Sequence, residues 1–373
     1  MPGFLARARR RPGFLLSRRS SALAFGAMVP NIRVMFEGQG YGQEAAAWTQ
    51  FWTGRARGSE HRYRDPRTAA VLEAHWRDFF VRQFDTAEAD AAAPLALVDL
   101  ACGEGEVLQL AGRFAEGRPD ITIDAYCADI APDAVALAAA DLPGGLEAEP
   151  AVADCSRLPF ASAAFSCAVS QYGLEYAGAD AFGEAARVVG EGGQFHALVH
   201  CQDGVVERAC SEVATLLGQV LDSALFDALA DYADTIPRAV RGEAPDAAAR
   251  ACVATLRAAL DRVTRAGSAA PPGPARDHVA RLVGDIQTLT GRLAAYAPAD
   301  VAAWIAGQRA DIEAFYHRMT SMVRVAQSDD QVRDLVARLE GAGLAVSPVS
   351  ALPAPQDGGS LAWVLDARRD GPA

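Results

Sequence analysis

The stretch LVDLACGEG, residues 97–105, decides the fold of this chain. An apolar run from Pro94 to Val98 ends at Asp99 and breaks into Ala-Cys-Gly-Glu-Gly, after which a helical pattern begins. A buried strand that leads through a glycine-rich turn into a helix is typical of the entrance to a nucleotide-type pocket in an α/β sheet. Glycine suits such a turn because a Cβ would keep the backbone from approaching a ligand closely.

Strand and helix patterns alternate on both sides of this turn. Strand-like runs lie at 94–99, 121–128, 150–153, 165–171, 194–201, 344–349 and 361–366, and helical patterns lie at 105–116, 132–141, 180–190 and 329–342. Repeated β-then-α units predict a Rossmann-like, doubly wound, mostly parallel sheet, here of seven strands. Between the fifth and sixth strands, helical patterns run through 205–233, 243–266, 276–296 and 298–325.

These patterns divide the chain into four expected parts. They are a basic, disordered N-terminal extension at 1–36, an N-terminal helical cap at 37–90, a Rossmann-like core at 91–201 and 329–368, and a large helical insertion or lid at 202–328. The extension holds seven arginines and no acid, as transit peptides do. The alternative is a start codon assigned too early, with Met28 or Met35 as the true beginning.

Charge and cysteine content narrow the classes of function. The formal net charge is −12, and without the seven arginines of the extension the remainder carries −19. Such an acidic body argues against a nucleic-acid substrate, whose binding depends on neutralising phosphates. No run of 18 apolar residues is present, so we expect no membrane span. The seven cysteines form no C-x-x-C pair, which predicts a cytoplasmic protein with free thiols and without a metal site.

Four motifs in order identify the pocket more closely. The dinucleotide fingerprint would need a third glycine where Leu108 stands, which makes phosphate recognition doubtful. Instead, DLACGEG (99–105), ADIAP (128–132), ADCSRLPF (153–160) and FSCAVSQYGLEY (165–176) resemble the successive motifs of class I S-adenosylmethionine-dependent methyltransferases. Within that family the resemblance is to the methyltransferase type 11 group, which includes quinone-biosynthesis C-methyltransferases. Ala101 stands where the family usually has its first glycine.

The resemblance implies S-adenosylmethionine as the cofactor and assigns residues to it. Asp99 and nearby amides would hold the methionine part, and Asp129 would accept both ribose hydroxyls, since a carboxylate has two oxygens. Asp154 and the Cys155 amide would bind adenine. The full set of implied cofactor-binding residues is Asp99, Ala101, Cys102, Gly103, Gly105, Asp129, Ile130, Asp154, Cys155 and Gln171.

Candidate catalytic groups follow the fourth and fifth strands, because open α/β sheets bind ligands at the carboxyl ends of their strands. They are Glu175, Tyr176 and His200, and the alternative for each is a solvated or capping loop residue. His196 is expected to be a hydrogen-bonded core histidine rather than a metal ligand.

The function predicted from these motifs is methyl transfer to a small, largely apolar organic molecule, with the helical insertion over the pocket mouth. The alternative is a protein that binds S-adenosylmethionine without catalysis and uses the insertion as an interaction surface. A third hypothesis, an NAD-dependent oxidoreductase, is disfavoured by Leu108 and by the Asp154-Cys155 segment.

Overall fold

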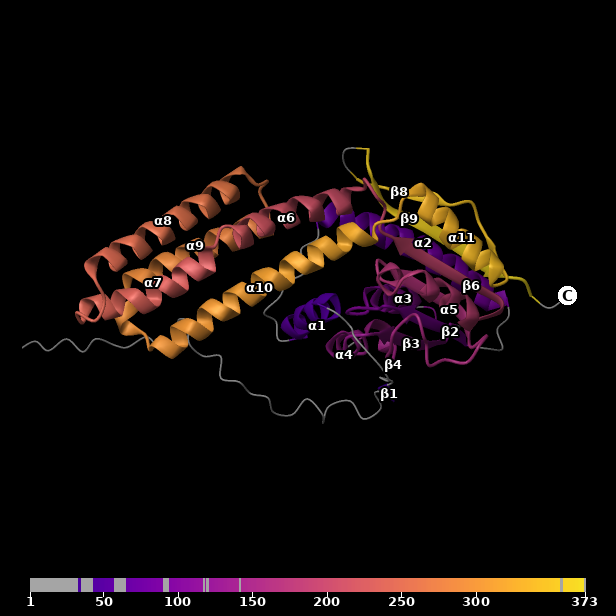
Figure 1. Ribbon diagram of the computed structural model, residues 1–373. Helices are drawn as coiled ribbons and strands as arrows, with labels where there is room; N and C mark the ends of the chain where they lie inside the picture. Colours follow the sequence, from indigo (N-terminus) through magenta and orange to yellow (C-terminus); the bar gives the residue numbers. More distant parts are fainter. Residues whose placement is uncertain are drawn as a thin grey trace, which may run out of the picture.

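The computed structural model describes residues 33–34, 43–56, 65–89, 94–116, 118, 121–140, 142–355 and 358–371. The predicted basic extension at 1–36 therefore lies outside the described residues, apart from 33–34. Figure 1 shows two parts, a sheet covered by helices and a bundle of long helices that projects from it.

The sheet is mixed and mostly parallel, as predicted. Its order is β1-β4-β3-β2-β5-β6-β9-β7, with β8 paired to β9, and β9 runs antiparallel to β6, β7 and β8. The strand bounds are β1 Arg33–Val34, β2 Leu95–Leu100, β3 Ile123–Asp129, β4 Ala148–Val152, β5 Phe165–Gln171, β6 Val189–Val199, β7 Leu344–Val346, β8 Ser350–Pro353 and β9 Ser360–Arg369. The described residues thus form nine strands, and the prediction of seven missed β1 and β8. Strand β8 lies in a Pro- and Gly-rich segment that reads as a loop, and pairing with β9 makes it a strand.

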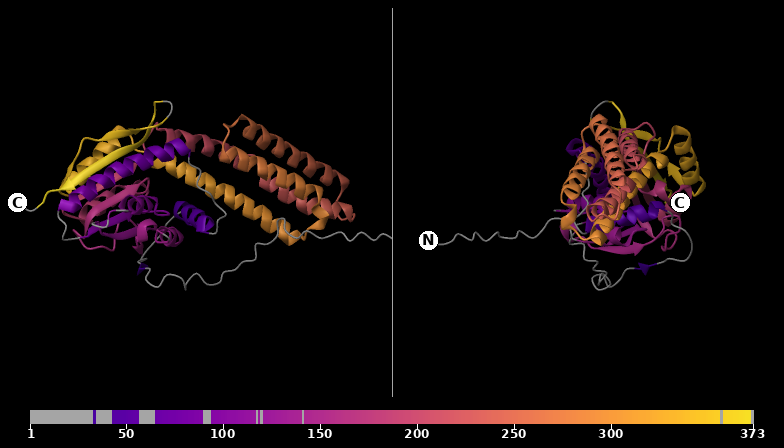
Figure 2. Two further views of the ribbon diagram at one scale, coloured as in Figure 1. Left: turned by 180° about the vertical axis from the view of Figure 1, so that it is seen from behind. Right: turned by 60° about the vertical axis from the view of Figure 1, so that its left-hand side comes forward.

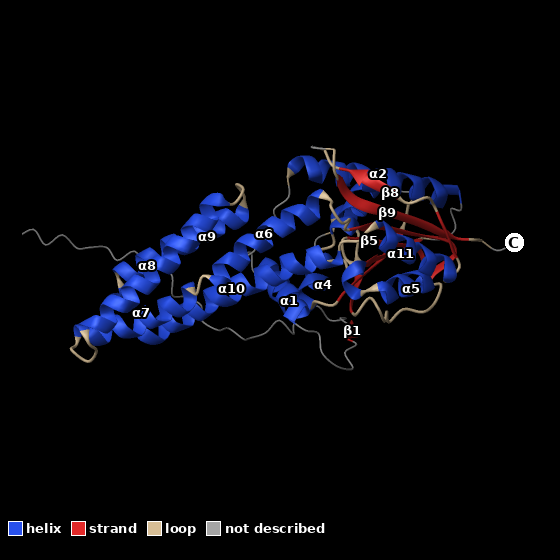
Figure 3. Cartoon of the chain, turned by 45° about the horizontal axis from the view of Figure 1, so that its top comes forward, coloured by secondary structure: helices blue, strands red, loops and turns tan. Residues whose placement is uncertain are grey.

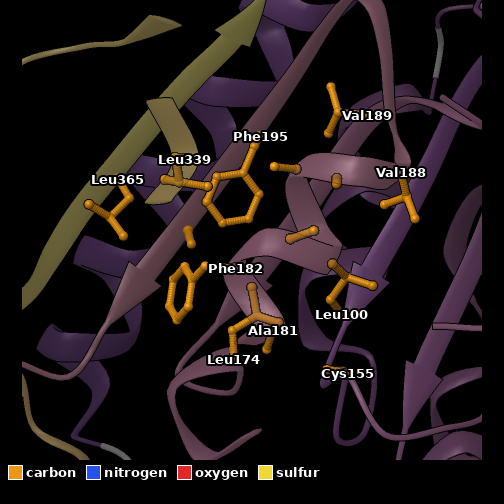
Figure 4. Close-up of a cluster of buried hydrophobic side chains, with 14 of the residues drawn as sticks. Leu100, Cys155, Leu174, Ala181, Phe182, Val188, Val189, Phe195, Leu339 and Leu365 are labelled. Atoms are coloured by element: carbon orange, nitrogen blue, oxygen red, sulfur yellow. The ribbon is translucent and has the colours of Figure 1, made fainter. Parts of the chain in front are cut away.

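Alternating side chains along the strands bury both faces of the sheet. From β2, Leu97 joins a cluster with the aromatic residues of α2 (Pro66–Ala89) and with α3 (Glu106–Ala115), whereas Val98 faces the opposite cluster. That second cluster packs α5 (Ala179–Val188) and α11 (Asp329–Gly341) against the sheet. Figure 4 shows Phe182 of α5, Phe195 of β6 and Leu339 of α11 together in it. The sheet therefore needs no solvent-exposed face, as its continuous apolar strands predict.

Helices α6–α10 form the projecting bundle and have a buried core of their own. Their bounds are α6 Val205–Asp222, α7 Leu225–Val240, α8 Asp246–Ala269, α9 Pro274–Gly291 and α10 Pro298–Val325. Most of the bundle extends away from the sheet, and α10 returns to it (Figures 1 and 2). The cartoon in Figure 3 shows the same separation of an all-helical part from the part that contains the strands.

The single helix predicted for 205–233 is two helices. Ala224 adopts a left-handed backbone conformation with φ 57°. The buried Ser223 hydroxyl accepts the Leu225 N–H at 3.2 Å and donates to the Val220 carbonyl at 2.6 Å. This serine therefore ends α6 and starts α7, a local competition for backbone groups that the apolar pattern does not reveal.

By length and composition, one helical stretch among the described residues, Val205–Val240, could cross a membrane, with a mean hydropathy of 1.4 in its most apolar window. Half of that window is buried within the structure, as expected for a core helix. The break at Ser223 divides this stretch within the bundle core.

A partly buried polar contact, as well as aromatic residues, holds helix α2 against the sheet. Nε2 of His75 lies 2.9 Å from Nε2 of His196 on β6, and Nδ1 of His196 lies 3.3 Å from the Asp366 carboxylate on β9. His196 is 1% exposed. The prediction that it is a hydrogen-bonded core histidine is confirmed.

Acid should loosen this contact. Burial, together with the neighbouring His196, lowers the pKa of His75 to about 4. An unfolded histidine titrates near about 6.5, so between these pH values the unfolded state binds more protons and stability falls as the pH falls. We expect His75→Gln to flatten this part of the stability curve, measured by urea unfolding from neutral pH down to pH 4. If the free energy of unfolding of the variant falls with pH as steeply as that of the wild type, other groups cause the acid sensitivity.

Candidate functional site

The glycine-rich turn forms as predicted, between β2 and α3. Ala101, Gly103 and Gly105 all have positive φ values, of 53°, 54° and 75°. At Gly105 a Cβ would lie 2.8 Å from the Ala138 Cα on α4 (Pro132–Ala138), so only glycine lets these elements approach. At Gly173, after β5, a Cβ would lie 2.5 Å from the Ala101 Cβ. Because Ala101 has a side chain, position 173, which packs against it, must be glycine.

Ala101 is strained, and Ala101→Gly should stabilise the protein. A left-handed conformation costs a residue with a Cβ about 1–2 kcal/mol, more than the extra backbone entropy of glycine, about 0.5–1 kcal/mol. We expect a net gain of about 0.5–1 kcal/mol in the free energy of unfolding, measured with urea. Ala96→Gly is the matched control, since Ala96 lies in strand β2 without positive φ and should lose stability instead. Equal losses in both variants would contradict the strain at Ala101.

Two buried carboxylates lie beside the turn, Asp99 at the end of β2 and Asp129 at the end of β3. Asp129 accepts the Gly103 N–H at 3.0 Å with one oxygen and the Ala131 N–H at 2.9 Å with the other. Burial raises the pKa of Asp129, and the N–H groups of Ala131, Gly103 and Ile130 oppose this shift. Asp129 therefore shapes the turn as well as facing the site.

Asp99 is the more unusual carboxylate. It is 1% exposed, and neither carboxylate oxygen has a hydrogen-bond partner. Burial, followed by the nearby carboxylates of Asp129 and Glu106, raises its pKa well above the usual range. A buried carboxylate without a partner is costly, so the site suits a ligand that brings a positive charge or several N–H donors.

The remaining predicted cofactor residues lie along the same edge. The Asp154 carboxylate accepts the Ser156 N–H at 2.8 Å, and the buried Cys155 thiol faces the Ala101 N–H, which places the 154–155 segment beside the turn. Cys102 and Ile130, in the turn and after β3, are half-buried. The structure thus brings the predicted set together at the carboxyl ends of β2, β3, β4 and β5.

Gln171 forms hydrogen bonds with two residues that the sequence motifs do not assign to the site. Its carbonyl oxygen accepts the Trp76 indole N–H at 2.7 Å, and its amide donates to the Glu106 carboxylate at 3.0 Å. Trp76 reads as an ordinary core aromatic of α2. Glu106 has a recognisable signal, since an acid in the first turn of a helix that follows a glycine turn lies at the pocket edge.

Helix α1 (Gln43–Ala56) covers the turn with aromatic side chains. A Cβ on Gly103 would lie 2.8 Å from the Trp52 ring, which is itself buried. The ring of Trp48 stacks on Trp52 at 6.5 Å and meets the Tyr176 ring edge-on at 5.4 Å. The Trp48 indole N–H is buried without a hydrogen-bond partner. These aromatic rings form a continuous path from the turn to the loop after β5.

Two of the three candidate catalytic residues form a buried pair. Glu175, in η2 (Leu174–Ala177), accepts the His200 backbone N–H at 3.0 Å, and the His200 ring Nδ1 lies 2.6 Å from the same oxygen, Oε1. Oε2 of Glu175 and Nε2 of His200 are buried without partners. The third candidate, Tyr176, packs its ring on His200 at 5.8 Å, and Tyr172 does so at 4.6 Å.

No group of three His, Cys, Asp or Glu side chains among the described residues is arranged to hold a metal ion. All seven cysteines, which lie in the described part of the chain, are free.

A family model and several solved structures match parts of this chain. Residues 98–197 match a family model described as a methyltransferase domain. Solved structures that resemble the chain include the YcgJ protein of Bacillus subtilis, with 17% identity over 35% of this chain and 52% of that chain, and a TM-score of 0.27. An S-adenosylmethionine-dependent methyltransferase of Mesorhizobium loti shares 21% identity over 31% and 52%, with a TM-score of 0.24. A geranyl diphosphate methyltransferase in complex with GPP and sinefungin shares 15% over 43% and 68%, with a TM-score of 0.30.

The chain spans 51% and 52% of the lengths of the first two solved structures it matches. No curated protein gives a match. The segment that carries the turn and the following strands, residues 98–197, is thus similar to a methyltransferase domain. The narrower resemblance to quinone-biosynthesis C-methyltransferases stays a prediction.

Proposed function

We propose that this protein binds S-adenosylmethionine at the glycine turn and transfers its methyl group to a small organic acceptor. The observation that carries the proposal is Asp99, a buried carboxylate without a hydrogen-bond partner beside the glycine turn. The methionine part of the cofactor has an ammonium group that would supply the missing donors. An NAD-type cofactor would instead bring phosphates to the turn, where the carboxylates of Asp99 and Glu106 would repel them. Asp129 does not separate the two cofactors, because an acid at that position can accept ribose hydroxyls from either.

In this proposal the chain's own residues bind and align. Asp99 holds the ammonium group, Asp129 accepts the ribose hydroxyls with its remaining lone pairs, and the 154–155 segment meets adenine. The cofactor supplies a methyl group on a positively charged sulfur, ready for in-line displacement. Trp48 and Trp52 of α1 cover the site and exclude water, which favours a reaction that disperses charge.

The acceptor site lies between α1, η2 and the last turns of α10. Helix α10 contacts both of the other elements, and it leads into Gln327, whose N–H donates to the His200 carbonyl at 2.8 Å. The side chains that α1 and η2 bring there are mostly aromatic, and the buried Arg318 of α10 lies over the Phe51 ring of α1. The aromatic majority suits a largely apolar acceptor. We propose that α10 is the part of the 202–328 region that acts as a lid, since most of the bundle projects away from the site.

Calorimetry tests the proposal directly. S-adenosylmethionine and S-adenosylhomocysteine should both bind to the wild-type protein, and NADH should not. Binding of NADH alone would refute the proposed cofactor. The alternative function, binding without catalysis, would show the same affinities with no transfer of a labelled methyl group to any member of a panel of small phenols, amines and quinols.

A further inference from the structure

We propose that His200, oriented by Glu175, is the general base of the reaction and that the acceptor is a phenol-type hydroxyl compound. This inference rests on the proposed function. It begins from the hydrogen bonds of the pair. Oε1 of Glu175 accepts the His200 backbone N–H and also lies 2.6 Å from the ring Nδ1. We assign the proton of this second contact to Nδ1, because an ionised carboxylate can only accept. The lone pair of the neutral imidazole is then on Nε2.

The buried Nε2 has no partner within the protein, and this is what points to a ligand. His200 is 2% exposed and the Glu175 side chain 1% exposed, so neither group reaches bulk water. A core histidine that served only packing would be expected to satisfy both ring nitrogens, as His196 does with His75 and Asp366. Nε2 of His200 is instead a buried acceptor that could accept a hydrogen bond from the hydroxyl or N–H group of a ligand.

The pair is placed correctly for an acceptor next to the cofactor. Strands β2, β5 and β6 are neighbours in that order, so His200 at the end of β6 lies two strands from the turn at the end of β2. At about 4.8 Å per strand the separation is roughly 10 Å. An acceptor bound over the carboxyl end of β5, the strand between them, would span this distance.

The surroundings of Nε2 favour an aromatic hydroxyl compound. The rings of Tyr172 and Tyr176 pack on His200, and Trp48 meets Tyr176 edge-on. Tyr172 is held in a left-handed conformation with φ 56°, and its hydroxyl donates to the Leu361 carbonyl at 3.1 Å. Backbone strain of this kind is found at functional sites and here fixes the ring beside the base. A flat aromatic acceptor can pack against these rings with its hydroxyl on Nε2.

The chemistry balances on these groups. As the acceptor oxygen bonds to the methyl carbon and the carbon–sulfur bond breaks with its electrons going to sulfur, Nε2 of His200 takes the hydroxyl proton. The positive charge that leaves the sulfur thus reappears on the imidazolium, where the Glu175 carboxylate stabilises it. General-base catalysis of this kind contributes about 100- to 10,000-fold to a rate.

The test uses 4-nitrophenol as the acceptor probe, because its phenolate absorbs visible light. With S-adenosylhomocysteine bound, at a pH where the free probe is mostly neutral, the wild-type protein should bind the probe with its proton on His200 and give the phenolate absorption. His200→Gln should bind it as the neutral phenol, and Glu175→Gln should give at least several-fold less phenolate than the wild type. With S-adenosylmethionine, His200→Gln should slow formation of 4-nitroanisole about 100-fold or more.

Controls separate this proposal from the proposed function. His278→Gln, on α9 in the bundle, is the matched substitution and should leave both signals unchanged. S-adenosylhomocysteine affinity, measured by calorimetry, should be equal in all variants, and its absence in the wild type would refute the proposed function. With that affinity intact, wild-type protein that does not bind the probe as phenolate overturns the role of the pair. Should His200→Gln fail to fold, Glu175→Gln decides, and an unchanged phenolate signal in it overturns the proposal.

Discussion

Asp99→Asn should make the ligand-free protein more stable and its binding of S-adenosylhomocysteine weaker. The wild-type carboxylate is buried without hydrogen-bond partners, so folding must either desolvate its charge or take up a proton. The isosteric amide avoids that cost, and we expect a gain of about 1–3 kcal/mol in the free energy of unfolding at neutral pH. The amide has no charge to pair with an ammonium group, and the affinity should fall about 10- to 100-fold, since a hydrogen bond between charged groups is worth about 1.5–3 kcal/mol.

The pH dependence of the stability gain identifies its cause. The pKa of Asp99 is raised in the folded state, whereas the unfolded carboxyl titrates near about 3.9. Above that pH the folded state binds more protons than the unfolded one, so wild-type stability is lost as the pH rises through the folded pKa. The difference between Asp99→Asn and the wild type should therefore grow as the pH rises above about 4. The His75 contribution is common to both proteins and cancels.

Thermal unfolding with and without S-adenosylhomocysteine measures both effects of Asp99→Asn. Asp124→Asn is the control, since Asp124 is an exposed acid on the neighbouring strand β3 and should change neither quantity. If Asp99→Asn has the stability and the affinity of the wild type, the buried carboxylate neither destabilises the folded protein nor binds the ligand.

The sequence predicts the core of the fold well because its signals are local and repeated. Leu97 and Val98 face opposite clusters, as two consecutive apolar residues of a doubly covered strand must, and the turn at 101–105 needs its positive φ values. The break between α6 and α7 escaped prediction because one buried serine hydroxyl competes with the helix, and hydrophobic periodicity contains no trace of it.

The candidate site was predicted as separate residues rather than as pairs. Glu175 and His200 are 25 positions apart, and only the adjacency of β5 and β6 joins them. The contact of Gln171 with Trp76 spans 95 positions and depends on where α2 docks. Motif spacing identifies which residues lie at the carboxyl edge of the sheet, whereas partners across the edge depend on strand order and helix docking.

Asp129→Ala should weaken S-adenosylhomocysteine binding by about 1–3 kcal/mol, or roughly 5- to 150-fold. The carboxylate would accept the ribose hydroxyls, and it already fixes the turn through the Gly103 and Ala131 N–H groups. Removing it leaves both buried N–H groups without their acceptor, so the ligand-free protein should also lose stability. Asp129→Ala should thus lower the free energy of unfolding of the ligand-free protein, whereas Asp99→Asn should raise it.

A truncated ligand distinguishes the two carboxylates. 5′-Methylthioadenosine keeps the adenine and ribose but lacks the amino-acid end, so Asp129→Ala should weaken its binding as much as that of S-adenosylhomocysteine. Asp99→Asn should weaken only S-adenosylhomocysteine, because the ammonium group that Asp99 pairs with is missing from the shorter ligand. Calorimetry of both ligands with both variants gives the four affinities. If Asp129→Ala leaves the affinity for 5′-methylthioadenosine unchanged, Asp129 does not bind the ribose, and its role is confined to the backbone of the turn.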